Sequence, residues 1–217
     1  MINVPYPVGS NGGTPIRVDL KIIADMVAPG ARVLDVGCGD GQLLAYLGLE
    51  KGVDGRGIDW SMAGVSACVA QGLSVIQGDA DTDLRDYPTA AFDYVILSQT
   101  LQATWEPRTI LEQMTRIGRR GIISFPNFGH WKVRLDLLTG GRMPVTEMLG
   151  YQWYDTPNIH LCTIKDFRAL CDELGIVVDK SISLDSRGRP QAWAADSALA
   201  NLLGAQAVFQ LRRKDQG

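Results

Sequence analysis

Clustered basic charge, long apolar runs, cysteine and histidine are all scarce in this sequence. Its 217 residues carry a net charge of −3, and Lys and Arg form no long run. A nucleic-acid surface needs clustered basic charge, so nucleic acid is not expected as a partner. No apolar run reaches about 18 residues, and the first residues lack the charged and then apolar pattern of a signal peptide. We therefore expect a cytoplasmic protein that has no membrane partner.

Cysteine and histidine are too few and too scattered to predict a metal site. The four cysteines include no C-x-x-C pair, and the only histidines are His130 and His160. A structural zinc site needs four such ligands at close spacing. We expect no metal, and we expect Cys68 and Cys171 to be reduced thiols in the core.

The most informative feature is a glycine-rich stretch at residues 33–41, VLDVGCGDG. It reads as a buried strand that runs into three glycines, Gly37, Gly39 and Gly41, and then into a helix. Glycine lets the backbone turn sharply and approach a ligand, and we expect the start of the helix to point unpaired N–H groups at the site. The pattern predicts a loop that binds a nucleotide cofactor, with Cys38 inside it.

The details of this loop favour S-adenosylmethionine over NAD. The dinucleotide fingerprint G-x-G-x-x-G requires a glycine at position 42, which is Gln42. Asp35 stands at the mouth of the strand, where it would repel a pyrophosphate by about 1 to 4 kcal/mol. The ammonium and sulfonium groups of S-adenosylmethionine suit this position, and its product S-adenosylhomocysteine shares the ammonium. Asp35 has a second reading, in which it only orients the loop.

The next two predicted strands also end in acids. Asp59 closes a strand at 55–59, about 20 residues after the loop, where an acid binds the ribose diol. Trp60 offers a flat apolar face to an adenine ring. A third strand at 73–77 leads to Asp79 and Ala80. Asp79 either accepts a hydrogen bond from the adenine amino group or merely terminates its strand.

Strands and helices alternate along the chain. This order predicts an α/β fold with one doubly wound, mainly parallel, seven-stranded sheet whose last strand is antiparallel. The fourth strand, residues 92–97, is almost continuously apolar, as expected for a strand buried on both faces. Ligands bind at the carboxyl edge of such sheets, so Ser98 and Gln99 are predicted to lie near the cofactor.

The predicted domain organisation is simple. Residues 1–15 read as a flexible lead-in, and residues 16–217 as one domain with an aromatic-rich insertion at 126–162. His130 and His160 lie in this insertion. A neutral imidazole can act as a general base, but no carboxylate stands at an obvious orienting distance. We therefore favour packing of the insertion over catalysis for both, and a backbone-shaping role for Asn127.

Four segments make the sequence similar to one particular family. They are SQTLQ at 98–102, SFPNFGHW at 124–131, GRMPV at 141–145 and WYDTPNIHLCT at 153–163. With the glycine loop, they resemble the bacterial MetW proteins of methionine biosynthesis over residues 17–184. At the ribose position we expect Glu from the family, where this chain has Asp59; the carboxylate is kept, but its reach is shorter by one methylene.

The resemblance implies a class I methyltransferase fold and a role in methionine synthesis alongside homoserine O-acyltransferase. It supplies no methyl acceptor. Two functions therefore remain. One is a module that binds S-adenosylmethionine and supports the acyltransferase, which we favour because no convincing acid/base pair is present. The other is methyl transfer to an unidentified small acceptor held under the insertion.

Overall fold

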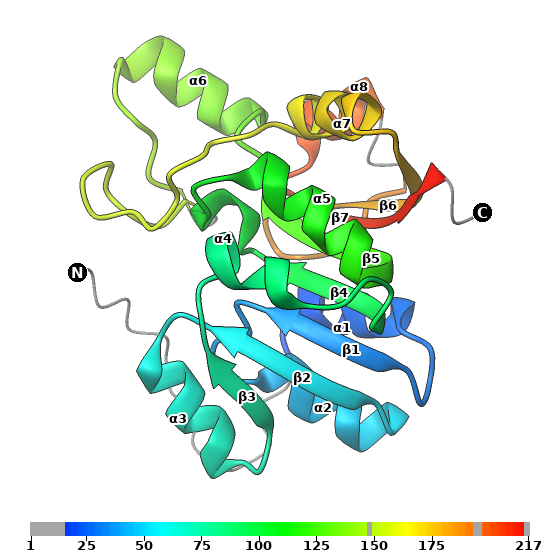
Figure 1. The fold of residues 1–217 in the computed structure, drawn as a ribbon. Helices are drawn as coiled ribbons and strands as arrows, with labels where there is room; N and C mark the ends of the chain where they lie inside the picture. The colour runs from blue at the N-terminus through cyan, green and yellow to red at the C-terminus, as the bar shows by residue number, and fades with distance from the viewer. Residues whose placement is uncertain (1–15, 147–148, 193–196, 215–217) are drawn as a thin grey trace.

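The computed structural model describes residues 16–146, 149–192 and 197–214. Seven strands form one sheet with helices on both faces (Figure 1). The strands are β1 (Arg32–Val36), β2 (Asp54–Asp59), β3 (Ser74–Gln77), β4 (Phe92–Ser98), β5 (Gly118–Pro126), β6 (Ile176–Leu184) and β7 (Gln206–Arg213). The helices are α1 (Val18–Met26), α2 (Gln42–Lys51), α3 (Met62–Ala70), α4 (Ala80–Asp83), α5 (Pro107–Ile117), α6 (Trp131–Gly140), α7 (Ile164–Glu173) and α8 (Ala198–Leu203), with 3-10 turns η1 (Leu84–Asp86) and η2 (Leu101–Ala103).

The strand order is β3-β2-β1-β4-β5-β7-β6. Strands β1 to β5 are parallel, and β7 runs antiparallel to both β5 and β6. The predicted doubly wound sheet with an antiparallel last strand is confirmed. The chain winds outward from β1 in one direction and from β4 in the other, so the order reverses between these two strands. Ligands bind at such a reversal.

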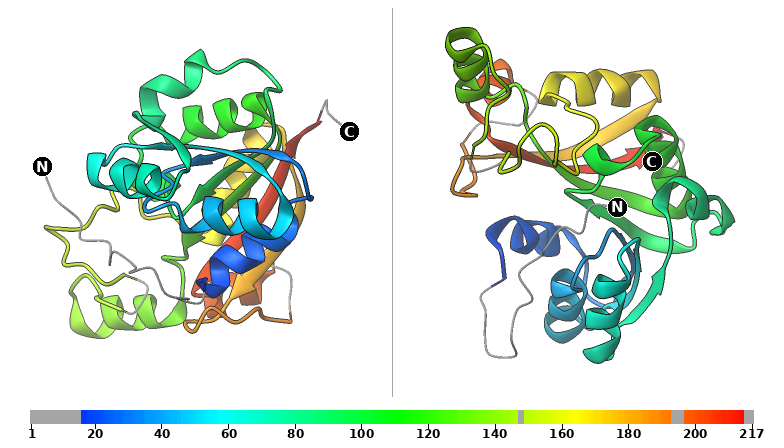
Figure 2. Two further views of the ribbon diagram at one scale, coloured as in Figure 1. Left: turned by 90° about the horizontal axis from the view of Figure 1, so that it is seen from below. Right: turned by 90° about the vertical axis from the view of Figure 1, so that its left-hand side faces the viewer.

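Successive residues of β1 face opposite layers of the core. Leu34 and Val36 pack with residues of α5 and α7 on one face, whereas Val33 packs with residues of α1 and α2 on the other. Both layers are visible in the turned views (Figure 2). Because the central strands are buried on both faces, their carboxyl ends are held rigidly, which fixes the loops that follow them.

Local signals explain where several helices begin. Thr163 and Asp166 form a capping box at the start of α7, each side chain accepting a backbone N–H of the other residue. The Ser61 hydroxyl accepts the N–H of Gly64 and caps α3. These hydrogen bonds satisfy donors that the first helical turn leaves unpaired.

The structure differs from the sequence prediction in small elements. Helix α4 and the turns η1 and η2 were not predicted, because three or four residues are too few to show helical periodicity. The predicted lead-in over residues 1–15 lies outside the described residues. Among the helices that the structure describes, none is both long and apolar enough to cross a membrane.

Candidate functional site

A cavity of about 310 Å³ opens at the carboxyl edge of the sheet, where the strand order reverses. Its walls come from the ends of β1 and β2 and from the segments that follow β3 and β4. Residues predicted to bind the cofactor that line the cavity are Gly37, Asp59, Trp60, Asp79 and Ala80. Three strand ends that are distant in sequence therefore meet at one cavity, as expected for a ligand site of this fold class.

The glycine loop is held closely against β2. The N–H groups of Gly37 and Cys38 both donate to the Ile58 carbonyl, at 2.8 and 3.3 Å. The Gly41 N–H donates to the Cys38 carbonyl, and the Gln42 N–H to an Asp40 carboxylate oxygen. The expectation of unpaired N–H groups concerned the start of α2, and it is wrong for Gln42. A pyrophosphate would have to compete with the protein for these N–H groups.

All three glycines adopt a backbone conformation that favours glycine, but their surroundings differ. All have positive φ, between 58° and 80°, which other residues rarely adopt. A Cβ on Gly37 would overlap Thr100, and a Cβ on Gly41 would overlap Leu73 and Cys68. A Cβ on Gly39 would meet nothing within 4 Å. The space beside Gly39 is thus open, whereas Gly37 and Gly41 permit close packing of the loop. Gly39 and Gly41 are not among the described residues that line the cavity.

Asp59 joins the loop to the next helix. Its Oδ2 accepts the Gly39 N–H at 2.7 Å, and its Oδ1 accepts the Ser61 N–H at 2.8 Å. Burial raises the pKa of Asp59, and the two hydrogen bonds act in the opposite direction. With both oxygens anchored, the carboxylate has a fixed orientation, and its remaining lone pairs can accept the hydroxyls of a ribose.

Asp35 is a buried acid that has one unsatisfied oxygen. Its side chain is 2% exposed, and Oδ1 has no hydrogen-bond partner among the described residues. Burial, and then the negative charge of Asp59, raise the pKa of Asp35 to about 7. Asp35 does not line the cavity. An unpaired buried carboxyl beside a second acid favours a positively charged neighbour.

The cavity wall that follows β3 and β4 contains residues that sequence reasoning missed. Asp81, Thr100, Thr104 and Trp105 line the cavity together with Ala103. The Asp81 carboxylate accepts the N–H groups of Trp105 and Glu106, both at 2.9 Å, and so ties α4 to the start of α5. No sequence signal marks this wall, because it forms from the short elements α4 and η2.

The structure gives Asp79 a role that was not predicted. Its Oδ1 accepts the Asp81 N–H at 2.9 Å and caps α4. It also lines the cavity beside Ala80. Contact with an adenine amino group uses a different lone pair and stays a prediction. Trp60 is 74% exposed at the same cavity, so its ring face is accessible to an adenine.

Ser98 and Gln99 lie at the end of β4, behind the cavity wall. The Gln99 N–H donates to the Ser124 carbonyl, and the Ser98 and Ser124 hydroxyls are 3.4 Å apart. Gln99 has a φ of 55°, which is a strained conformation for a side chain of this kind. The strain lies where the chain turns from β4 into the cavity wall.

Cys38 points away from the cavity. Its thiol packs with Leu44 and Cys68 in a small cluster under the loop. Burial raises the pKa of Cys38 and of Cys68, so both thiols stay protonated at neutral pH. Cys38 therefore contributes packing beneath the loop, and any contact with a ligand comes from its backbone.

The charge of the residues that line the cavity favours one of the two nucleotide cofactors, S-adenosylmethionine or NAD, over the other. Asp59, Asp79 and Asp81 are acidic, and no Lys, Arg or His is among the described residues that line it. A diphosphate would face this negative charge with no basic partner, at a cost of about 1 to 4 kcal/mol for each close pair. A sulfonium and an ammonium are attracted instead. The residues present thus fit S-adenosylmethionine and not NAD.

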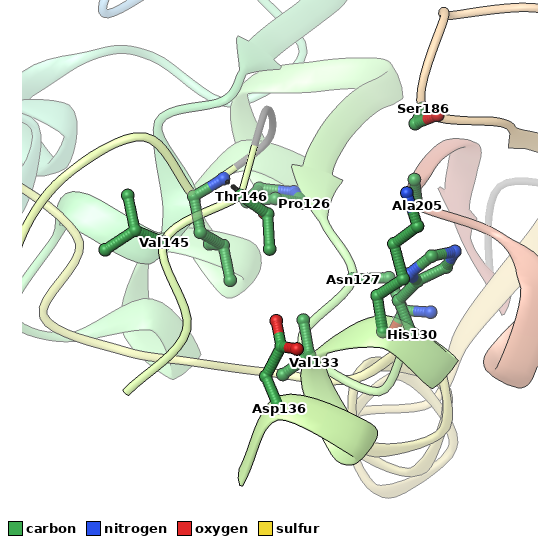
Figure 3. A pocket seen from close by; sticks show the side chains of 11 residues that line it. Pro126, Asn127, His130, Val133, Asp136, Val145, Thr146, Ser186 and Ala205 are labelled. Carbon is green, nitrogen blue, oxygen red and sulfur yellow. Dashed lines mark hydrogen bonds between the residues drawn. The ribbon is translucent and has the colours of Figure 1, made fainter. Parts of the chain in front are cut away.

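The two histidines lie in different surroundings. His130 lines a second cavity, where it lies beside Asn127 and Ala205 (Figure 3). His160 is exposed, and its Nε2 is 3.2 Å from the Trp105 carbonyl. Burial, and then the charge of Lys132, lower the pKa of His130, so this ring is neutral at pH 7.

The Asn127 side chain makes four hydrogen bonds to backbone groups, in line with its predicted backbone-shaping role. Its Nδ2 donates to the carbonyls of Asn201 and Gly204, and its Oδ1 accepts the N–H groups of Gly129 and Ile164. These four bonds connect the end of β5 to α7 and to the segment before β7. The side chain shapes the chain and has no donor left for a ligand.

One protein family matches almost the whole chain. The family model described as methionine biosynthesis protein MetW matches residues 17–211. The chain belongs to the MetW family. A curated relative from Rhodopirellula baltica, the bifunctional methionine biosynthesis protein MetXA/MetW, is 35% identical over 179 residues. The match covers 78% of this chain, but the chain spans only 29% of that relative.

Solved structures show that this MetW family member has a class I methyltransferase fold. A chain of the Haloferax volcanii complex with the Trm112 methyltransferase activator superposes with a TM-score of 0.67 and 17% identity, covering 90% of this chain and 88% of that one. A Thermotoga maritima S-adenosylmethionine-dependent methyltransferase gives 0.63 and 14%, covering 91% and 88%. Identities this low establish the fold, whereas the reaction depends on the site.

Proposed function

We propose that this protein binds S-adenosylmethionine and supports homoserine O-acyltransferase in methionine biosynthesis. The acid-lined cavity carries the proposal: its lining has carboxylates, an exposed tryptophan and no basic side chain among the described residues. When bound, the cofactor brings a sulfonium centre and an amino acid moiety to the edge of the sheet. Asp59 would hold the ribose, Trp60 would cover the adenine, and Asp35 would balance the positive charge.

An exposed apolar face on α6 supports the partner half of the proposal. Trp131, Leu135 and Leu138 lie four and three residues apart, so they share one side of the helix, which we call the α6 stripe. All three are exposed, Leu138 to 84%, and α6 stands apart from the sheet (Figure 1). Trp153 and Tyr154 in the same insertion are also exposed. Large exposed apolar surfaces of this kind typically bind another protein.

The insertion is hydrogen-bonded directly to the wall of the cofactor cavity. The Gln102 carbonyl, in η2, accepts the N–H groups of both Ile159 and His160, at 2.9 and 3.0 Å. Residues on either side of Gln102 line the cavity. A ligand that shifts this wall therefore also shifts the insertion, which is the physical route for S-adenosylmethionine to change binding of the partner.

The name of the Rhodopirellula relative supports this choice of partner. It joins MetXA and MetW in one bifunctional protein, and we take its MetXA part as the homoserine O-acyltransferase. Two domains linked in one chain have a high effective concentration with respect to each other. We infer that separate MetW chains reach the same arrangement by binding the acyltransferase through the α6 stripe.

The test is the affinity of the purified protein for homoserine O-acyltransferase, measured by calorimetry. Leu138→Asp places a charge on the α6 stripe and should weaken binding at least tenfold, or about 1.4 kcal/mol. Leu49→Asp is the matched control, because Leu49 is equally exposed on α2. S-adenosylmethionine should change the wild-type affinity by about 1 to 3 kcal/mol. Equal affinities for the two variants would exclude the α6 stripe as the interface.

Methyl transfer is a second candidate, because the neutral His130 lines a cavity at the end of β5. A neutral imidazole there can remove a proton from an acceptor. The protein's other contribution would be to orient the acceptor and exclude water. Incubation with methyl-labelled S-adenosylmethionine and a panel including homoserine and acyl-homoserine tests this reaction. Labelled product that disappears in His130→Gln supports transfer, and no product across the panel argues against it.

A further inference from the structure

A second cavity of about 220 Å³ lies between α6 and the edge of the sheet. It shares no described lining residue with the first cavity. Its walls come from the end of β5, from α6, from the insertion around residue 146 and from the segment after β6 (Figure 3). Support of homoserine O-acyltransferase gives this cavity no ligand, and the second candidate function places only an unidentified methyl acceptor near His130.

The cavity lies under a helix that contacts the body weakly. Val133 is the only buried residue of α6. The Arg134 side chain donates to the Gly129 carbonyl at 2.6 Å, close to where the helix begins. Few other contacts fix the helix, so a ligand placed beneath it would bury additional surface of α6 and hold it to the sheet.

Two opposite charges on α6 flank this space. Lys132 and Asp136 are four residues apart, on one side of the helix, and both line the cavity. They form no ion pair with each other. The Lys132 ammonium lies 5.9 Å from the Trp131 ring centre, and Asp136 has no hydrogen-bond or ion-pair partner among the described residues. The Asp136 carboxylate points into the cavity (Figure 3).

The rest of the lining is apolar or uncharged. Pro126, Val133, Val145 and Leu149 provide apolar surface, and the side chain of Asn127 has no free donor. A ligand that satisfies both charges carries an ammonium for Asp136 and a carboxylate for Lys132, with an uncharged short chain for the apolar wall. We propose that the second cavity binds a free α-amino acid with a short uncharged side chain.

Calorimetry with L-methionine and L-homoserine tests the proposal. Both are titrated with and without saturating S-adenosylmethionine, which keeps methionine out of the first cavity. One saturable site is expected, and Asp136→Asn and Lys132→Gln should each weaken it at least tenfold. L-methionine methyl ester and N-acetyl-L-methionine, which each lack one charge, should bind at least tenfold more weakly.

Asp155→Asn is the matched control, because Asp155 is an exposed acid of the insertion that does not line the cavity. It should bind both amino acids like the wild type. Asp136→Asn should keep its affinity for S-adenosylmethionine, so failure here and failure of the proposed function are distinguishable. Absence of saturable binding up to about 10 mM, or binding that Asp136→Asn leaves unchanged, would overturn the proposal.

Discussion

At the scale of single residues, Asp35 gives the site a dependence on pH. Its carboxyl has a pKa of about 7, raised by burial and then by Asp59. Below this pH the group is protonated and cannot balance a cationic ligand. A cation bound nearby favours the carboxylate, so ligand binding expels the proton.

The affinity for S-adenosylmethionine should therefore rise as the pH increases from about 5.5 to 7, by up to about tenfold per pH unit, and level off above. Calorimetry across this range gives the slope. Asp35→Asn removes the titrating carboxyl at position 35, so most of the pH dependence of the affinity should disappear. Only the pH dependence due to Asp59 should remain. A wild-type affinity that does not change with pH would show that Asp35 is not coupled to the ligand.

Asn127 is the residue on which the local fold depends most clearly. It is 2% exposed, and Asn127→Ala leaves the N–H groups of Gly129 and Ile164 without their acceptor. The variant should lose about 2 to 4 kcal/mol of unfolding free energy in urea. Asn158→Ala should change the unfolding free energy by less than about 0.5 kcal/mol, because Asn158 is half-buried and its side chain makes no hydrogen bond to the described residues. A loss below about 1 kcal/mol for Asn127→Ala would contradict this role.

At the scale of elements, substitutions in the glycine loop can distinguish an effect on folding from an effect on ligand binding. Gly39 and Gly30 both have positive φ, and a Cβ on either meets nothing within 4 Å. Alanine at either position should cost a similar amount of stability, about 1 to 2 kcal/mol. Gly39→Ala alone should weaken S-adenosylmethionine binding, by more than tenfold, because its methyl group would enter the open space beside the loop, where we propose that the ligand lies.

Thermal unfolding and calorimetry on both variants check this prediction. Gly30 lies between α1 and β1, at the opposite edge of the sheet, so Gly30→Ala should bind the ligand like the wild type. If Gly39→Ala also binds normally, the ligand does not approach the loop at this glycine.

The sequence predicted the large elements of this chain well, because each carries several independent signals. The strand at β4 is almost continuously apolar, and α7 has both a capping box and an apolar stripe. The cavity wall around Thr100 and Trp105 was not predicted, since it forms from turns of three or four residues. Its position depends on long-range hydrogen bonds such as those from Trp105 and Glu106 to Asp81.

At the scale of the whole molecule, the insertion that carries the α6 stripe contacts both cavities. The first cavity contacts the insertion through Gln102, and the second lies under α6. The strand order that creates the first cavity was not visible in the sequence, because register and order depend on which strands pair in space. In the insertion, Val133 is buried but Trp153 is exposed. The amino-acid composition of the insertion does not show which of its apolar side chains are buried.

The central claim is that the acid-lined cavity binds S-adenosylmethionine, and direct calorimetric titration tests it. The wild-type protein should bind S-adenosylmethionine at one site per chain and bind NAD at least about 100-fold more weakly, a difference of about 2.7 kcal/mol. Binding of NAD with equal or higher affinity, or no heat from S-adenosylmethionine at millimolar concentration, would contradict the account.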